Sequence, residues 1–246
     1  EYQQVAYQEI QTHFKDKSTV LLHGITSPGK TEIYIKLIQE AIDANKQILY
    51  LLPEIALTTQ IVTRLQAIFG EKVGVYHSRF NENERVEVWN NVLKFNPGHY
   101  EDFQIILGAR SSLFLPFSKL GLIIVDEEHE NTFKQYDPSP RYQARDASLV
   151  LAQMQGSKVL LGSATPSIES YTNAKEGKYG LVTLSKRHGN VTLPEITCAD
   201  VKEAMRKKKM NSHFTPELLK MMEENLEAGK QIILFQNRRG YSPVMM

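Results

Sequence analysis

A chain of 246 residues, 41% hydrophobic and 23% charged, has the composition of an ordinary globular protein and fits one large domain or two small ones. This composition excludes collagen-like, mucin-like and wholly disordered chains. The formal net charge is +1, so bulk charge does not by itself indicate a nucleic-acid partner. Residues 206–209 form a basic run, which fits either a solvated loop or a contact with phosphate.

Strand-like and helix-like segments alternate between residues 18 and 185. Short apolar runs predict strands at 18–24, 47–53, 73–77, 104–109, 120–126, 158–164 and 180–185. Apolar residues at helical spacing predict helices at 30–44, 56–69, 82–93 and 144–155. Strands rich in β-branched residues, without alternation, are typical of parallel sheets covered on both faces. We therefore predict an α/β fold, a parallel sheet with helices on both faces, which binds ligands at the carboxyl ends of its strands.

The composition changes after about residue 186. Thr215 and Pro216 predict the start of a helix, which stops at Gly229, and an apolar strand is predicted at 231–235. Because one helix and one strand cannot bury a core, this part reads as the incomplete beginning of a second domain. The predicted domain ranges are 1–190 and 191–246.

Cysteine use and hydropathy bear on the cellular compartment. Cys198 is the one cysteine, which excludes a disulfide framework and any zinc site that needs two thiolates from this chain. No apolar run reaches the roughly 18 residues of a membrane-spanning helix, and no signal peptide is evident. We therefore expect a reducing, cytoplasmic compartment and no membrane partner.

The first motif that carries chemistry is GITSPGKT, which matches G-x-x-x-x-G-K-[ST] between a predicted strand and a predicted helix. In this pattern, N–H groups of the turn and the helix N-terminus hold phosphates, the lysine reaches the β- and γ-phosphates, and the last hydroxyl binds Mg²⁺. The predicted nucleotide-binding residues are Gly24, Ile25, Thr26, Ser27, Pro28, Gly29, Lys30 and Thr31. A Gly-rich turn without function is the alternative, and Pro28 lacks an N–H that could bind phosphate.

The second motif is DEEH, which begins at the end of the predicted strand 120–126. Beside a phosphate-binding loop, Asp126 is expected to hold Mg²⁺, and Glu127 to orient and deprotonate the attacking water. The alternative is a strand end that carries solvated acids.

The third motif is GSATP, at the end of the predicted strand 158–164. The small hydroxyl residues Ser163 and Thr165, close to the acidic motif, could relay the state of the nucleotide to a neighbouring surface. The alternative is a plain turn in which Thr165 and Pro166 open a helix.

These three motifs, in this order, resemble the first motor lobe of superfamily 2 helicases. Further segments are similar to the PriA family of bacterial primosomal replication-restart helicases: PEIALTTQ, VYHSRFNENER, LGARSSLFLPF, DEEHENTFKQYDPSPRYQARD and FQNRRGYSP. The resemblance spans essentially the whole chain. It implies a RecA-like motor lobe of the P-loop NTPase type, followed by the truncated start of a second lobe. It also implies an ATP-driven DNA helicase that moves 3′ to 5′, recognises stalled forks and restarts replication as part of the primosome.

The same resemblance implies roles for individual residues. The phosphate-binding loop and Asp126 are implied to contact ATP and Mg²⁺. Glu127, together with Lys30, is implied to carry out hydrolysis, and Gln3 is implied to contact adenine. Coupling of hydrolysis to DNA falls on His129, Ser163 and Thr165.

Predicted DNA contacts fall on two segments. A T-R-S-type contact of the family corresponds to Arg110 and Ser111, although this chain has Ala109 in place of Thr. An aromatic-rich loop corresponds to 133–145, where rings could stack on the bases of a single strand and arginines meet phosphate. The residues expected to do so are Phe133, Tyr136, Arg141, Tyr142 and Arg145. The alternative is that these aromatic rings fill a small core within the loop.

The family pattern also sets limits on this chain. Family members usually have Gly where this chain has Ser27, which puts the speed of hydrolysis in doubt. The amino-terminal DNA-binding region, the cysteine-rich zinc module and the arginine finger of the second lobe are expected outside this chain. Zinc is thus expected in the intact protein but not in this chain. We expect the isolated chain to bind nucleotide weakly and to unwind no DNA.

The implied partners are forked and single-stranded DNA, the primosome and helicase-loading proteins, and single-stranded DNA-binding protein. Two other functions remain open. One is a double-strand DNA translocase, which shares the three general motifs but not the aromatic-rich segment. The other is a fork-binding adaptor with a vestigial ATPase, which Ser27, Pro28 and Ala109 favour.

Overall fold

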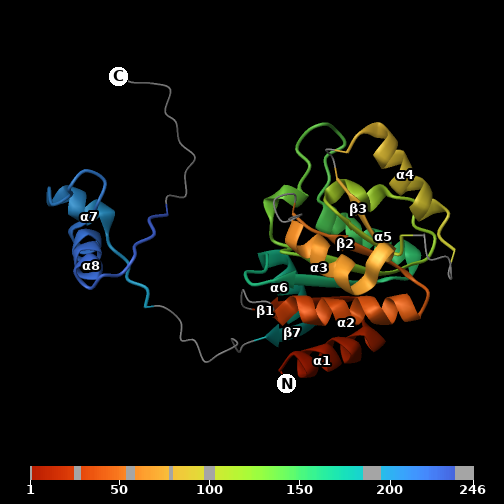
Figure 1. Ribbon diagram of the computed structural model, residues 1–246. Helices are drawn as coiled ribbons and strands as arrows, with labels where there is room; N and C mark the ends of the chain where they lie inside the picture. Colours follow the sequence, from red (N-terminus) through yellow and green to blue (C-terminus); the bar gives the residue numbers. More distant parts are fainter. Residues whose placement is uncertain are drawn as a thin grey trace. The chain divides into compact units, whose positions relative to one another are not determined.

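The computed structural model describes residues 2–24, 29–53, 59–77, 80–96, 103–184 and 195–235. The chain forms two compact units, Glu1–Val191 and Thr192–Met246 (Figure 1). Some predicted features lie outside the described residues: the start of the predicted helix 56–69, and the phosphate-loop residues Ile25, Thr26, Ser27 and Pro28.

A seven-stranded parallel sheet forms the centre of the first unit. Its strands are β1 (Thr19–Gly24), β2 (Gln47–Leu51), β3 (Val73–Tyr76), β4 (Ile105–Gly108), β5 (Leu120–Asp126), β6 (Lys158–Ser163) and β7 (Gly180–Leu184). Their order across the sheet is β3-β4-β2-β5-β6-β1-β7, and each neighbouring pair is parallel. Every strand lies where an apolar run predicts it, so the predicted α/β fold is confirmed.

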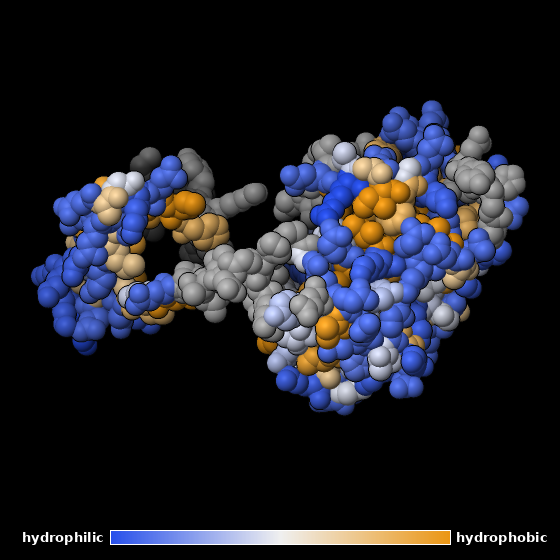
Figure 2. Space-filling view, turned by 60° about the horizontal axis from the view of Figure 1, so that its bottom comes forward, coloured by the Kyte–Doolittle hydropathy of each residue, from blue (hydrophilic) through white to orange (hydrophobic). Residues whose placement is uncertain are grey.

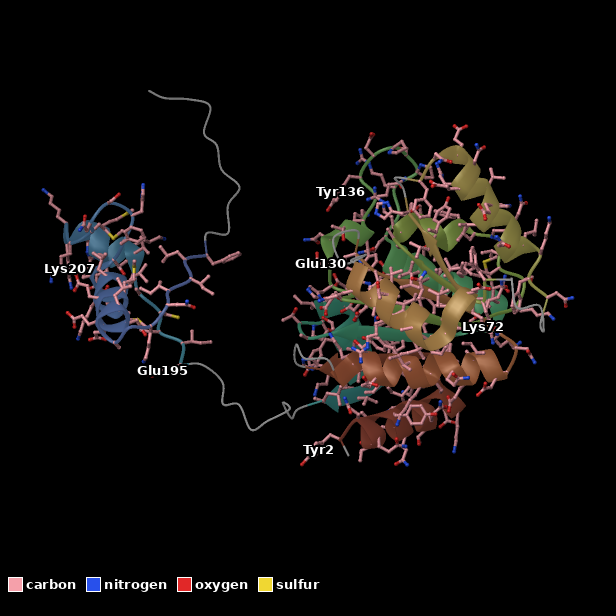
Figure 3. All side chains as sticks on the ribbon, in the orientation of Figure 1. Tyr2, Lys72, Glu130, Tyr136, Glu195 and Lys207 are labelled. Carbon is pink, nitrogen blue, oxygen red and sulfur yellow. The ribbon has the colours of Figure 1, made fainter. Side chains whose placement is uncertain are left out.

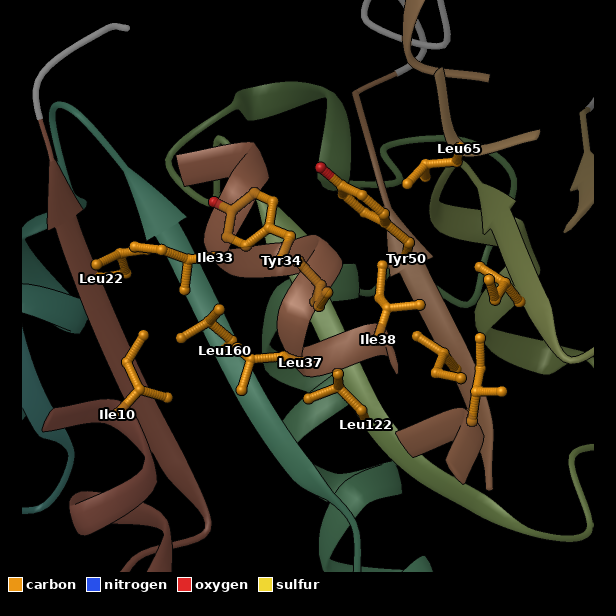
Figure 4. Packing of buried hydrophobic residues seen from close by; sticks show 14 of the residues in the cluster. Ile10, Leu22, Ile33, Tyr34, Leu37, Ile38, Tyr50, Leu65, Leu122 and Leu160 are labelled. Carbon is orange, nitrogen blue, oxygen red and sulfur yellow. The ribbon is translucent and has the colours of Figure 1, made fainter. Parts of the chain in front are cut away.

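Helices cover both faces of this sheet (Figure 1). On one face lie α1 (Tyr2–Asp16), α2 (Gly29–Asp43) and α3 (Thr59–Phe69), and on the other lie α4 (Glu82–Leu93), α5 (Ala144–Gln155) and α6 (Ile168–Lys175). In β5, Leu122 and Ile124 pack into the first layer, shown in Figure 4, whereas Ile123 and Val125 pack into the second. Because both faces are buried, the strand is apolar throughout instead of alternating.

Local signals fix several of the helix ends. Asn81 caps α4 in a capping box: its side chain accepts from the Glu84 N–H at 3.0 Å, and the Glu84 carboxylate accepts from the Asn81 N–H at 2.9 Å. The helix α5 ends at Gly156, whose φ of 65° only glycine adopts without cost. The alternative in which Thr165 and Pro166 open a helix does not hold, because the residue that caps α6 is Ser167.

The second unit contains two helices among its described residues, α7 (Val201–Arg206) and α8 (Pro216–Glu227). Thr215 caps α8 as predicted, through its side chain and the Leu218 N–H. The strand predicted at 231–235 is not formed, because a strand needs a hydrogen-bonded neighbour and the described part of this unit offers none. Ile233 and Phe235 are 93% and 84% exposed, and hydrophobic residues are visible on the surface of this unit in Figure 2.

Length and hydropathy decide one further point. Among the described helices, none is both long and apolar enough to cross a membrane.

Candidate functional site

The sheet order brings the three sequence motifs to one edge. Strand β6 lies between β1 and β5, with His23 of β1 opposite Ser163 and Gly162 opposite Asp126 of β5. The carboxyl ends of these three parallel strands are therefore neighbours. The residues that follow them come from segments far apart in the sequence but face the same space.

Lys30 lies in the first turn of α2, immediately after the phosphate-binding loop. Its side chain is buried, with 6% of the residue exposed, and its Nζ donates to Glu127 Oε1 at 3.0 Å. Thr31 follows it and is half-buried. At the start of the same helix, the Gly29 carbonyl accepts from Gln3 Nε2 at 3.4 Å. The structure thus brings Gln3 of α1 to the N-terminal end of α2.

Asp126, at the end of β5, is held by three donors. Its Oδ1 accepts from the Tyr34 hydroxyl at 2.9 Å and from the Glu127 N–H at 3.2 Å, and its Oδ2 accepts from the Tyr50 hydroxyl at 3.3 Å. Burial raises the pKa of Asp126, while the charge of Lys30 and the Tyr34 hydrogen bond lower it in part. A desolvated carboxylate in a fixed orientation is a suitable oxygen ligand for Mg²⁺, whose charge would replace the missing solvation.

Glu127 occupies an unusual backbone conformation directly after the strand. Its φ is 50°, in the left-handed region that a residue with a side chain enters at a cost of about 1–2 kcal/mol. The turn sends the Glu127 carboxylate toward Lys30 on one side and toward His129 on the other, with 3.7 Å between Glu127 Oε2 and His129 Nδ1. Strain of this kind is typical of functional turns.

His129 joins the acidic motif to the segment that follows β6. Its Nδ1 is 2.8 Å from Ser163 Oγ, and its Nε2 is 3.4 Å from Thr165 Oγ1. Ser163 Oγ also accepts from the Thr165 N–H at 3.0 Å. The three residues predicted to couple hydrolysis to DNA therefore form one hydrogen-bonded chain beside Glu127.

Sequence reasoning assigned no role to Glu128, which is fully buried. Its carboxylate accepts from Ser167, from Ser170 and from Arg145. No signal in the sequence identifies it, because the type of a residue in a turn does not determine the direction of its side chain.

Two predicted DNA contacts do not fit their positions. Phe133 is 1% exposed and packs into the core between the sheet and α5, so its ring has no free face for a base. Arg145 is 8% exposed, and its guanidinium binds Glu128 at 3.1 Å and Asp146 at 2.7 Å. Both predicted DNA contacts are therefore wrong: Phe133 packs into the main core and not into a small core within the loop, and Arg145 forms an internal ion pair.

Arg110 and Ser111 begin a short 3₁₀ helix after β4, η2 (Arg110–Phe114). Arg110 Nη1 donates to the Lys134 carbonyl at 2.9 Å and lies 3.5 Å from the Thr132 carbonyl. Both residues are half-buried. The predicted T-R-S-type contact is thus tied to the start of the aromatic-rich loop.

The remaining residues of that loop differ in exposure. Tyr136 is 63% exposed and Arg141 is exposed, and Tyr136 projects from the loop in Figure 3. Tyr142 is half-buried and packs edge-to-face on Phe114, with ring centroids 5.0 Å apart. Of the three aromatic residues predicted to stack on bases, Tyr136 is therefore the one whose ring is largely open to solvent.

Comparison with known proteins agrees with this geometry. Residues 1–174 match the family model for DEAD/DEAH box helicases. The chain is 40% identical over 226 residues to Replication restart protein PriA of Bacillus subtilis (strain 168), and 43% identical over 223 residues to that of Chlamydia trachomatis serovar D. These alignments cover 92% and 91% of this chain but 27% and 29% of the relatives, so the chain spans less than a third of their length. The resemblance to the PriA family is confirmed.

A likeness to solved structures supports the fold alone. The structure of RecG bound to a three-way DNA junction superposes with a TM-score of 0.55 at 20% identity, over 76% of this chain and 24% of that one. The RecA-like lobe expected from the motifs is thus confirmed as a fold.

Proposed function

Because the chain belongs to the DEAD/DEAH box helicase family, we propose that it is the first motor lobe of an ATP-dependent DNA helicase that restarts replication and moves 3′ to 5′. One observation carries this proposal: Lys30, in the first turn of α2, lies beside Asp126 and Glu127 at the end of β5, with its Nζ 3.0 Å from Glu127 Oε1. The similarity to proteins named Replication restart protein PriA supports the biological role.

In the proposed reaction, Lys30 binds the phosphates of ATP. A γ-phosphate near the start of α2 competes with Glu127 for the ammonium, which now lies 3.0 Å from that carboxylate. Glu127 is then free to orient the attacking water and take its proton. Thr31 and Asp126 are the residues that would hold Mg²⁺, which neutralises charge on the phosphates. Gln3, beside Gly29, fits a contact to the adenine.

DNA coupling is proposed for the hydrogen-bonded chain of His129, Ser163 and Thr165. His129 lies beside Glu127 and is hydrogen-bonded to Ser163 and Thr165, at and after the end of β6. A change at the phosphates would therefore reach the segment after β6 through His129. On the outer surface, Tyr136 is proposed to stack on a base and Arg141 to meet phosphate, because both are exposed on one loop.

The second DNA segment is proposed to contribute from η2. Arg110 and Ser111 are the proposed contacts there. The half-buried Tyr142 packs edge-to-face on Phe114 of η2 and so joins the loop to this segment. Since these residues lie in or next to one loop, DNA bound to Tyr136 would also be near Arg110.

We propose that 1–190 is the first lobe and that 191–246 begins the second. The division of the chain into the compact units Glu1–Val191 and Thr192–Met246 supports this proposal. Hydrolysis in such motors takes place between two lobes, so the isolated chain is expected to bind nucleotide weakly and to unwind nothing. Forked and single-stranded DNA, primosome and helicase-loading proteins, and single-stranded DNA-binding protein are the proposed partners of the intact gene product, in the cytoplasm. Zinc, if present in the intact protein, is expected outside this chain, since Cys198 is its one cysteine.

A strand-displacement assay tests this function. The intact gene product, given Mg-ATP, should release the duplex strand from a substrate with a 3′ single-stranded tail and not from a matched substrate with a 5′ tail. Glu127→Gln should bind ATP but release no strand, because the amide cannot take a proton from water. Movement along duplex DNA without strand release would indicate a translocase instead, and fork binding without ATP turnover would indicate an adaptor.

A further inference from the structure

A buried acid that the proposed reaction does not use lies in the middle of the catalytic turn. Glu128 is fully buried, and its two neighbours in the chain, Glu127 and His129, both face the nucleotide side. A carboxylate is costly to bury unless donors satisfy it. The donors around Glu128 therefore show which parts of the protein its buried carboxylate holds together.

Four hydrogen bonds converge on this carboxylate. Glu128 Oε1 accepts from the Ser167 N–H at 2.7 Å. Its Oε2 accepts from Ser167 Oγ at 3.0 Å, from Ser170 Oγ at 2.8 Å and from Arg145 Nη1 at 3.1 Å. The Glu128 N–H in turn donates to the Gly162 carbonyl at 3.1 Å. Side chain and backbone of one residue thus join the end of β5 to β6, to the start of α5 and to the cap of α6.

These contacts hold both ends of the segment that carries the GSATP motif. At its beginning, Ser163 is bound by His129. At its end, Ser167 is bound by Glu128, which also keeps Ser167 in place as the cap of α6. The turn from Glu127 to His129 therefore has three anchors: Lys30, Ser163 and the network around Glu128.

We propose that Glu128 is a positioning residue for ATP hydrolysis, whose buried carboxylate fixes the strained turn that aims Glu127 at the attacking water. This inference rests on the proposed hydrolytic function. Glu127 has a φ of 50°, and nothing in its own side chain favours that conformation, so its neighbours must hold it. Glu128 supplies this hold without touching nucleotide or water.

A single change of charge tests the proposal, because Gln cannot satisfy the same donors. The Ser170 hydroxyl can rotate to accept, and Ser167 Oγ already accepts from Arg145 Nη1 and from the Ser170 N–H. The Ser167 N–H on Oε1 and the Arg145 N–H on Oε2 can only donate. Whichever way the amide of Glu128→Gln is turned, its NH₂ meets one of these two donors. The turn must then shift, although the side chain keeps its shape and volume.

The experiment measures steady-state ATP hydrolysis by the intact gene product. Glu128→Gln should lower kcat at least tenfold and leave the KM for ATP within threefold of wild type, because the phosphate contacts of Lys30 remain. Glu130→Gln is the matched control: it lies two residues further along, is partly exposed, and should keep kcat within twofold. In a Glu127→Gln background, Glu128→Gln should have no further effect on the residual single-turnover rate, since it acts through Glu127.

Thermal unfolding, recorded for every variant, separates positioning from mere stability. The Glu128→Gln protein is assayed well below its own unfolding temperature. If its unfolding temperature is lower than that of wild type but its kcat is unchanged, the inference is overturned. A change confined to KM overturns it as well. If Glu128→Gln does not fold, Ser170→Ala removes one of the four bonds and should lower kcat about threefold with the fold intact; a wild-type kcat there also refutes the inference.

The two proposals fail in different ways. Hydrolysis lost in Glu127→Gln but kept in Glu128→Gln leaves the proposed function standing and overturns the inference alone. Absence of ATP hydrolysis in the wild-type protein overturns both.

Discussion

Replacing Gly162 with alanine is expected to displace the side chains around Asp126, the proposed Mg²⁺ ligand, through one methyl group. A Cβ at this position would lie 1.9 Å from the Tyr34 hydroxyl oxygen, 3.0 Å from Tyr34 Cζ and 3.3 Å from Asp126 Oδ1. Tyr34 is fully buried against the sheet (Figure 4), so its ring has no open space to move into. The hydroxyl must leave its position 2.9 Å from Asp126 for the methyl group to fit.

The magnitude follows from two costs. Overpacking a well-packed core costs about 1–3 kcal/mol. Loss of a hydrogen bond to a charged group costs about 1.5–3 kcal/mol. Together they lower the free energy of unfolding by about 2.5–6 kcal/mol. For a chain of this size, this lowers the unfolding temperature by about 5–24 °C.

Thermal unfolding followed by circular dichroism measures this effect, with Tyr34→Phe as the matched background. If the clash with the hydroxyl is the cause, Gly162→Ala should cost less than half as much when Tyr34 is already Phe, although the contact with Cζ stays tight. A Gly162→Ala chain as stable as wild type, or an equal cost in both backgrounds, would refute this reasoning.

Three further changes probe the charges of the site. Lys30→Ala removes the ammonium from the phosphates and should weaken Mg-ATP binding at least about 100-fold in calorimetry; unchanged affinity would contradict its role. Asp126→Asn removes the charge of a half-buried carboxylate, and desolvation raises the pKa of this carboxylate. Because the pKa is raised, the Asp126 carboxyl of the folded protein keeps its proton at pH values where the unfolded chain has lost it. The contribution of Asp126 to stability therefore falls as pH rises through the raised pKa. Asp126→Asn should therefore unfold at a higher temperature than wild type above that pKa, with the difference shrinking at lower pH, and should lose Mg²⁺-dependent nucleotide binding. Arg145→Ala leaves the carboxylate of Glu128 buried and unpaired, and should cost about 3–5 kcal/mol in denaturant unfolding; a cost below 1 kcal/mol would show that the pair is not needed.

The hydrophobic pattern predicted the sheet because a strand buried on both faces is a continuous apolar run. Strand β5 is apolar at every position from Leu122 to Val125, since each residue packs into one of the two layers. Helix α1 went unpredicted for the opposite reason. It buries only Ala6, Ile10 and Phe14, one residue per turn, so its polar face dominates the pattern.

The sequence predicted which motif residues lie at the ends of the strands. It did not predict the directions of the side chains in the loops. That Asp126, Ser163 and Lys30 meet follows from the sheet order, in which β6 lies between β1 and β5. The direction of a side chain in a loop does not follow from its type. Phe133 and Arg145 have the chemistry of DNA contacts, but packing and an internal acid bury both.

The most direct test of the whole account is the rate of ATP hydrolysis by the intact gene product, with and without forked DNA, and with Lys30→Ala as control. The account predicts hydrolysis that forked DNA stimulates strongly and that the Lys30→Ala protein lacks. A rate that DNA does not change, with fork binding intact, would contradict the account and favour an adaptor with a vestigial ATPase.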